Sequence, residues 1–178
     1  MASQLKVNEI IKQSGSSITI GETGDTVSGP FTNVPAFYAK VGSNQTISDN
    51  TQTKIAFDTE VFDTNSAYNT SDYRFTVPTG FAGKYMINGA YAFSNYGGAA
   101  GDRIQLIIRR NGSDNNDGFI GDYAPSTAGS ADPGIEINRV LSLAVGDYLE
   151  MYVYQTTGAS ATLMSAYSSF AGYRIIGA

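Results

Sequence analysis

Pro35-Ala-Phe-Tyr-Ala-Lys-Val41 opens a series of short segments in which apolar and polar residues alternate, separated by Gly, Pro or Asp. The series continues through Ile55-Ala-Phe-Asp-Thr59, Tyr73-Arg-Phe-Thr-Val-Pro78 and Gly83-Lys-Tyr85, and ends with Leu143-Ala-Val-Gly-Asp-Tyr-Leu149 and Phe170-Ala-Gly-Tyr173. A period of two is typical of strands that bury one face, and frequent turn residues are typical of antiparallel connections. The pattern therefore predicts an all-β antiparallel sandwich.

We expect about ten strands in this region and no helix. They cover residues 36–41, 53–57, 60–63, 73–77, 83–94, 102–110, 117–123, 134–143, 147–156 and 166–176. Within these strands, large apolar residues at every second position should face the core, because side chains alternate between the two faces of a strand. The expected core residues are Tyr85, Ile87, Tyr91, Phe93, Ile104, Leu106, Ile108, Ile135, Ile137, Leu141 and Leu143, with Phe57, Phe75 and Phe170 at the ends.

The order of these segments resembles the C1q/TNF-like jelly-roll family. That family opens with Ala-Phe-x-Ala, continues through Phe-Asp-Thr, Phe-x-x-Pro, Gly-x-Tyr and Leu-x-x-Gly-Asp, and closes on Phe-x-Gly-Phe. Here Tyr173 takes the place of the last aromatic residue. The resemblance covers residues 35–178 and implies a ten-stranded antiparallel jelly-roll head that assembles as an obligate homotrimer.

The first 34 residues differ from the rest and predict a short, extended N-terminal stem, or attachment arm, that precedes the head at residues 35–178. Its apolar residues lie on a segment too short to bury them, so they need a partner surface. They are Leu5, Val7, Ile10 and Ile11. The opening Ala2-Ser-Gln-Leu-Lys-Val-Asn-Glu-Ile10 also resembles the start of small virion proteins of tailed phages, especially cyanophage tail and fibre proteins that carry C1q-like heads.

Composition argues against several classes of function. The net charge is -5, and the nearest thing to a basic cluster is Arg109-Arg110, so a nucleic-acid partner is not expected. Histidine and cysteine are both absent, which removes the Ser-His-Asp triad, thiolate nucleophiles and the usual zinc ligands. We expect no enzymatic activity. Apolar runs such as residues 104–108 are too short for membrane insertion, and no secretion signal is visible at the N-terminus.

The segment Asn111-Gly-Ser-Asp-Asn-Asn-Asp-Gly118 is rich in oxygen ligands, and Asp122 follows it. Such ligands suit calcium, which makes Asp114, Asp117 and Asp122 weak candidates for a metal site. The spacing does not match an EF-hand loop, and Asn, Asp and Gly are also the residues that hairpin turns require. Both interpretations stay open at this point, and no other cofactor is expected.

A row of tyrosines marks the strand after Gly146-Asp147. Tyr148, Glu150, Tyr152 and Tyr154 share one face of it, and Leu149, Met151 and Val153 share the other. An antiparallel sheet usually exposes one polar face to water, so two bulky faces indicate a second apolar environment, and tyrosine suits protein interfaces. We predict that this row forms the trimer interface; the alternative is a solvated tyrosine face.

These expectations converge on a protein that binds or builds. The leading hypothesis is a bacteriophage virion protein, made in the cytoplasm of the bacterial host, whose trimeric head serves as a tail fibre or other peripheral adhesin. Its arm would attach to other virion proteins, and its head would meet a glycan or protein on the host surface. The alternative is a capsid decoration, or cement, protein. A soluble lectin-like or cytokine-like ligand is a third possibility.

Overall fold

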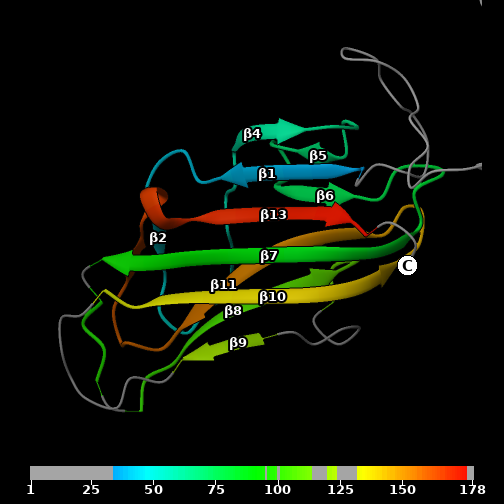
Figure 1. Cartoon of the computed structure of the whole chain (residues 1–178). Coiled ribbons are helices and arrows are strands. Elements are labelled where there is room, and N and C mark those ends of the chain that lie inside the picture. The colour runs from blue at the N-terminus through cyan, green and yellow to red at the C-terminus, as the bar shows by residue number, and fades with distance from the viewer. Residues whose placement is uncertain (1–33, 95, 100, 114–119, 124–131, 176–178) are drawn as a thin grey trace, which may run out of the picture. The chain divides into compact units, whose positions relative to one another are not determined.

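The structure is a computed structural model that describes residues 34–94, 96–99, 101–113, 120–123 and 132–175. Within these residues, thirteen strands form two antiparallel sheets of seven and six strands. Figure 1 shows β4, β1, β13, β7 and β10 side by side in one layer, with β11 passing behind it. The arm residues Leu5, Val7, Ile10 and Ile11 lie outside the described residues, so the division into arm and head stays a prediction.

The seven-stranded sheet has the order β2 (Gln45–Ile47), β12 (Ala161–Leu163), β7 (Gly83–Ser94), β13 (Ser169–Arg174), β1 (Ala36–Lys40) and β4 (Thr59–Asp63), and β10 (Gly134–Leu143) pairs with β7. The six-stranded sheet has the order β5 (Tyr68–Asn69), β6 (Arg74–Thr76), β11 (Tyr148–Gln155), β8 (Ile104–Arg110) and β9 (Ile120–Tyr123), and β3 (Thr53–Lys54) pairs with β11.

The all-β antiparallel architecture is confirmed, and each of the ten expected segments contains a strand. Three further strands, β2, β5 and β12, were not expected, because pieces of two or three residues carry no readable periodicity. The segment 53–57 is a strand only over Thr53–Lys54, and a short 3-10 helix at Ser165–Tyr167 stands where the last strand was expected to begin. In the described part of the chain, no helix is long and apolar enough to cross a membrane.

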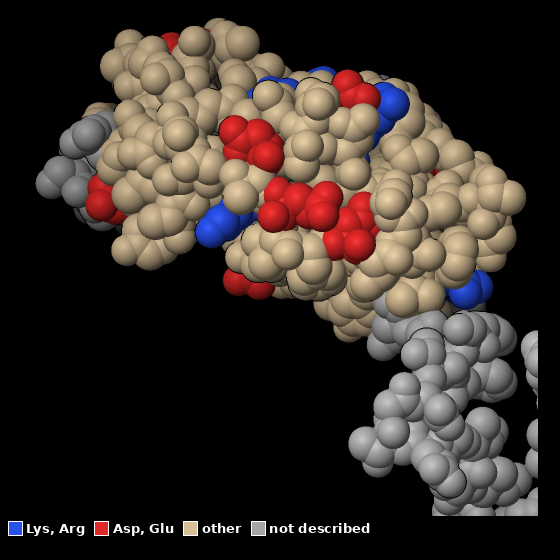
Figure 2. Space-filling view, turned by 90° about the horizontal axis from the view of Figure 1, so that it is seen from above, with Lys and Arg blue, Asp and Glu red and all other residues tan. Residues whose placement is uncertain are grey.

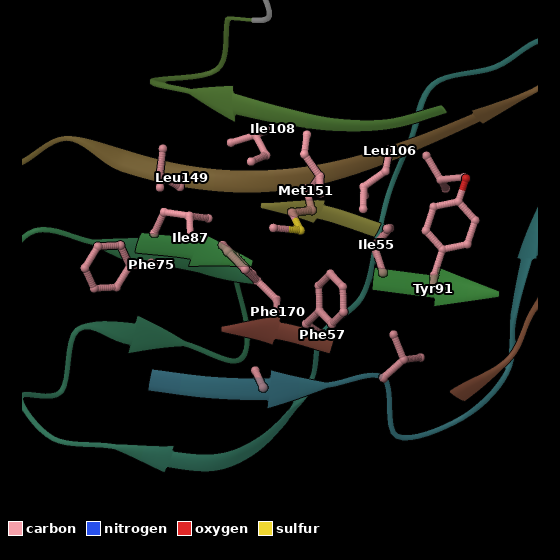
Figure 3. Close-up of a cluster of buried hydrophobic side chains, with 14 of the residues drawn as sticks. Ile55, Phe57, Phe75, Ile87, Tyr91, Leu106, Ile108, Leu149, Met151 and Phe170 are labelled. Carbon is pink, nitrogen blue, oxygen red and sulfur yellow. The ribbon is translucent and has the colours of Figure 1, made fainter. Parts of the chain in front are cut away.

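The core lies between the two sheets, as Figure 3 shows. The predicted row of β7 is buried, with Tyr85, Ile87, Tyr91 and Phe93 at most 1% exposed. The remaining core predictions hold as well, except that Ile135 is only partly buried at the start of β10. Aromatic rings join the layers, and Phe37 of β1 stacks on Phe75 of β6 with ring centroids 4.6 Å apart.

Two glycines make this close packing possible. A Cβ atom on Gly89 of β7 would lie 2.2 Å from Sδ of Met151, which reaches across from β11. A Cβ atom on Gly172 of β13 would lie 2.7 Å from Ile87 Cδ1 and 2.9 Å from Phe37 Cε1. The Phe-Ala-Gly-Tyr motif therefore carries glycine because the neighbouring core side chains occupy the space of its side chain.

Asp147 holds the hairpin between β10 and β11. Its carboxylate accepts hydrogen bonds from the Ala144 backbone N–H at 2.9 Å and from the Asn111 side-chain amide at 2.8 Å. Arg110 lies 3.9 Å away. Although burial acts to raise the pKa of Asp147, the hydrogen bonds from Asn111 and Ala144 and the charge of Arg110 hold it below its usual value. This explains the Gly-Asp step of the late hairpin.

We predict that Asp147→Ala lowers the free energy of unfolding by about 1–3 kcal/mol, because each hydrogen bond to a charged group contributes about 1.5 kcal/mol or more. The folded-state pKa lies below the unfolded value, so the stabilisation is present above about pH 3.9 and is lost as the pH falls through the folded pKa. Urea unfolding of both proteins at pH 7 and pH 3 measures it. A stability difference that does not shrink at pH 3 would contradict the assignment.

Candidate functional site

The outer face of the seven-stranded sheet carries large apolar side chains that nothing in the described chain covers. Val140 of β10 is 55% exposed, Phe62 of β4 is 47% exposed and Tyr173 of β13 is 44% exposed. Together with the half-buried Tyr38, Met86 and Ala171, these residues form what we call the β7-sheet face. A contiguous apolar surface of this kind is typical of a protein interface.

Strand register arranges this face in transverse rows. One row contains Val140, Met86, Tyr173 and Ala36, and the next contains Asn138, Asn88, Ala171, Tyr38 and Phe62. In the second row the rings of Tyr38 and Phe62 meet edge to face, with centroids 6.3 Å apart. The aromatic side chains therefore gather over β13, β1 and β4, and the β10 side of the face is more polar.

A hydrogen-bonded polar trio lies on that side. The Asn138 amide donates to Glu136 Oε1 at 2.6 Å, and the Asn88 amide donates to Asn138 Oδ1 at 2.7 Å and to Glu136 Oε1 at 3.4 Å. Glu136 and Asn138 are exposed on β10, and Asn88 is half-buried on β7. The trio orients a carboxylate next to apolar surface.

The predicted tyrosine row lies on the outer face of the other sheet. Tyr148, Tyr152 and Tyr154 are half-buried, whereas Glu150 is only 7% exposed. On the other face of the strand, Leu149, Met151 and Val153 are buried in the core. Whether the row contacts another copy is untested and stays a prediction.

Cationic side chains of the same chain cover this row. Lys54 forms an ion pair with Glu150 at 2.6 Å. The Arg74 guanidinium lies 4.9 Å from the Tyr148 ring centroid, and that of Arg109 lies 3.9 Å from the Tyr152 centroid. These contacts were not expected from the sequence, because the cations come from three other strands. Side chains of the same chain therefore cover much of the face that was predicted to meet another copy.

The calcium candidates gain no support. Asp114 and Asp117 lie outside the described residues, and Asp122 belongs to β9, whose side chains are not described. Among the described residues, no group of three Asp or Glu side chains is close enough to hold a metal ion. The metal site stays a weak prediction.

Figure 2 shows a further surface, seen from above Figure 1, on which acidic side chains gather near the centre. Acidic residues also raise the pKa of a buried tyrosine, Tyr68 of β5. Burial, and then the charge of Asp58, raise the pKa of the Tyr68 hydroxyl, which donates to the Phe57 carbonyl at 2.9 Å. Such a surface repels polyanions.

The fold matches known structures although the sequence does not. No family model matches the chain, and no curated protein matches it. The globular domain of zebrafish complement 1qA is similar at 19% identity and a TM-score of 0.55, covering 79% of this chain and 97% of that domain. The fold is that of the C1q and TNF jelly rolls. Murine APRIL is similar at 13% identity and a TM-score of 0.55, covering 79% of this chain and 98% of that chain. Eiger TNF from S. frugiperda is similar at 14% identity and a TM-score of 0.52, covering 80% of this chain and 93% of that chain.

The β7-sheet face was not predicted, because no single strand carries a signal for it. The outward-facing residues of β7, which include Met86, Ala90 and Ala92, are mostly small or polar and do not by themselves indicate an interface. Only register brings Tyr38, Phe62 and Tyr173 from three other strands beside it.

We predict that Lys54→Met lowers the free energy of unfolding by about 1–3 kcal/mol, because it leaves the Glu150 carboxylate buried without its cation. The double variant Lys54→Met/Glu150→Gln should recover most of the loss, since no charge then remains unpaired. Chemical denaturation of the wild type, both single variants and the double variant gives the coupling energy. Additive losses would show that the pair does not stabilise this face.

Proposed function

We propose that the head assembles as a homotrimer and binds a partner rather than catalysing a reaction. The observation that carries the proposal is the exposed apolar β7-sheet face, with Val140, Phe62 and Tyr173 at 44–55% exposure. Burying such side chains contributes about 25 cal/mol per Å² of apolar surface removed from water. The likeness in fold to C1q and TNF-family structures agrees with the homotrimer that the sequence resemblance implies.

A trimeric ring requires a heterologous interface, in which one part of the surface of each copy meets a different part of the next copy. The β7-sheet face meets this requirement because its aromatic part lies over β13, β1 and β4 while its polar part lies over β10. The tyrosine row of β11 is the competing interface. Its rings are less exposed and already contact Arg74 and Arg109, so a partner would gain less by covering it.

We predict that Val140→Lys dissociates the trimer, because it buries a charge in an apolar contact. Val145→Lys is the matched control, since Val145 is 48% exposed but lies in the hairpin turn, away from the face. Light scattering should give three times the 18.9 kDa chain mass for the wild type and the control. If Tyr152→Glu dissociates the trimer and Val140→Lys does not, the interface is the tyrosine row.

The biological setting we propose is the surface of a phage virion, where the trimer serves as the head of a tail fibre or other peripheral adhesin. The N-terminal likeness to phage virion proteins supports it, as does the surplus of apolar residues on the arm. The absence of histidine and cysteine from the sequence supports a role in binding. A neutral glycan or a protein on the host suits the weakly charged head better than a charged polymer does.

We predict that replacing Leu5, Val7 and Ile10 by Ser yields intact free trimers that do not incorporate into particles, because the arm then lacks its apolar contacts. Shortening the segment 124–134 should leave incorporation normal and reduce adsorption to the host. Immunoblots of purified particles and adsorption assays measure the two effects. Normal adsorption together with particles that lose shell stability would favour the decoration protein instead.

A further inference from the structure

Two side chains of opposite charge on the β7-sheet face make no ion pair with the described part of their own chain. Lys40 is exposed at the end of β1, and Glu136 is exposed on β10 with only the Asn88 and Asn138 amides as partners. Other cations of the head do have partners, such as Lys54 with Glu150 and Arg74 with Asp72. Lys40 and Glu136 are therefore available to a partner surface, as is the exposed Lys84 of β7.

Strand register places these two residues in one transverse row. Glu136 lies opposite Ala90, and Ala90 lies opposite Ser169. Ser169 continues the β1–β13 register to Lys40, one residue beyond the pair Ala39 and Phe170. Three strand spacings separate β10 from β1, which amounts to about 14 Å. This separation is too long for an ion pair within one copy.

In the neighbouring rows, too, the side chains at the β10 end are suited to contact those at the β1 end. Val140 shares its row with Tyr173 and Ala36, so apolar surface stands at both ends. Asn138 shares its row with Tyr38, whose hydroxyl donates no hydrogen bond within the described residues. If the three-fold axis of a ring runs along the strands, each row of one copy meets the same row of the next.

We propose that the β10 side of one copy packs on the β1 side of the next and that Glu136 forms an intermolecular ion pair with Lys40. The proposal rests on the homotrimer proposed above. The two asparagines hold the Glu136 carboxylate in place before assembly, which reduces the ordering cost of the contact. An ion pair at the margin of an apolar interface adds orientation and specificity, because a copy turned end for end would leave both charges unpaired.

Charge reversal tests the pair. We expect Lys40→Glu and Glu136→Lys each to raise the concentration at which half of the trimer dissociates by at least tenfold, as measured by sedimentation of the full chain. The double variant Lys40→Glu/Glu136→Lys should return to within threefold of the wild type. Asp72→Lys is the control, because Asp72 is exposed and lies between β5 and β6 of the other sheet, away from the β7-sheet face.

The outcomes separate this proposal from the trimer itself. A wild-type chain that is monomeric at all concentrations would overturn the homotrimer. A wild-type trimer in which the single variants dissociate no more than Asp72→Lys, or in which the double variant is worse than either single variant, would overturn the ion pair alone. Circular dichroism of each variant checks that the sandwich is folded, and Lys40→Met and Glu136→Gln repeat the test without introducing a new charge.

Discussion

The stack of Phe37 of β1 on Phe75 of β6 joins the two sheets of the sandwich. Phe170 meets Phe37 edge to face with centroids 4.9 Å apart, and Tyr68 stacks on Phe37 at 5.2 Å, so one ring of β1 contacts residues of three other strands. Sheets held this closely leave no room for side chains at Gly172 and Gly89. The aromatic contacts and the glycines are therefore one constraint, and both sheets depend on it for their separation.

Because the inner faces of both sheets are buried in this core, binding to the sheets must occur on their two outer faces. On the six-stranded sheet, Lys54, Arg74 and Arg109 satisfy the carboxylate and rings of β11 from within the chain. On the seven-stranded sheet no such cover exists among the described residues, and Val140 and Tyr173 are exposed. The asymmetry explains why a partner gains more apolar contact on one side of the sandwich than on the other.

The fold could be predicted because strand alternation and turn residues are local signals. Tyr85, Ile87, Tyr91 and Phe93 are buried as their spacing indicates, and the Gly-Asp hairpin forms where its motif lies. The surfaces could not be predicted in the same way. The cover over Tyr152 comes from Arg109 on another strand, and the β7-sheet face combines residues of five strands. Which side chains meet across strands depends on register, and alternation within one strand carries no information about it.

An apolar sheet face next to a long edge strand is also a hazard, because open edges invite uncontrolled strand addition. Within the described residues, β10 pairs only with β7 over its ten residues. Charged and amide side chains on β10, including Glu136, Asn138 and Arg139, oppose the addition of an arbitrary strand. The polar groups that disfavour the addition of an arbitrary strand favour one specific contact. It is the proposed contact in which a neighbouring copy supplies Lys40 to Glu136. In the homotrimer that we propose, the polar trio therefore limits association with arbitrary strands and selects the geometry of assembly.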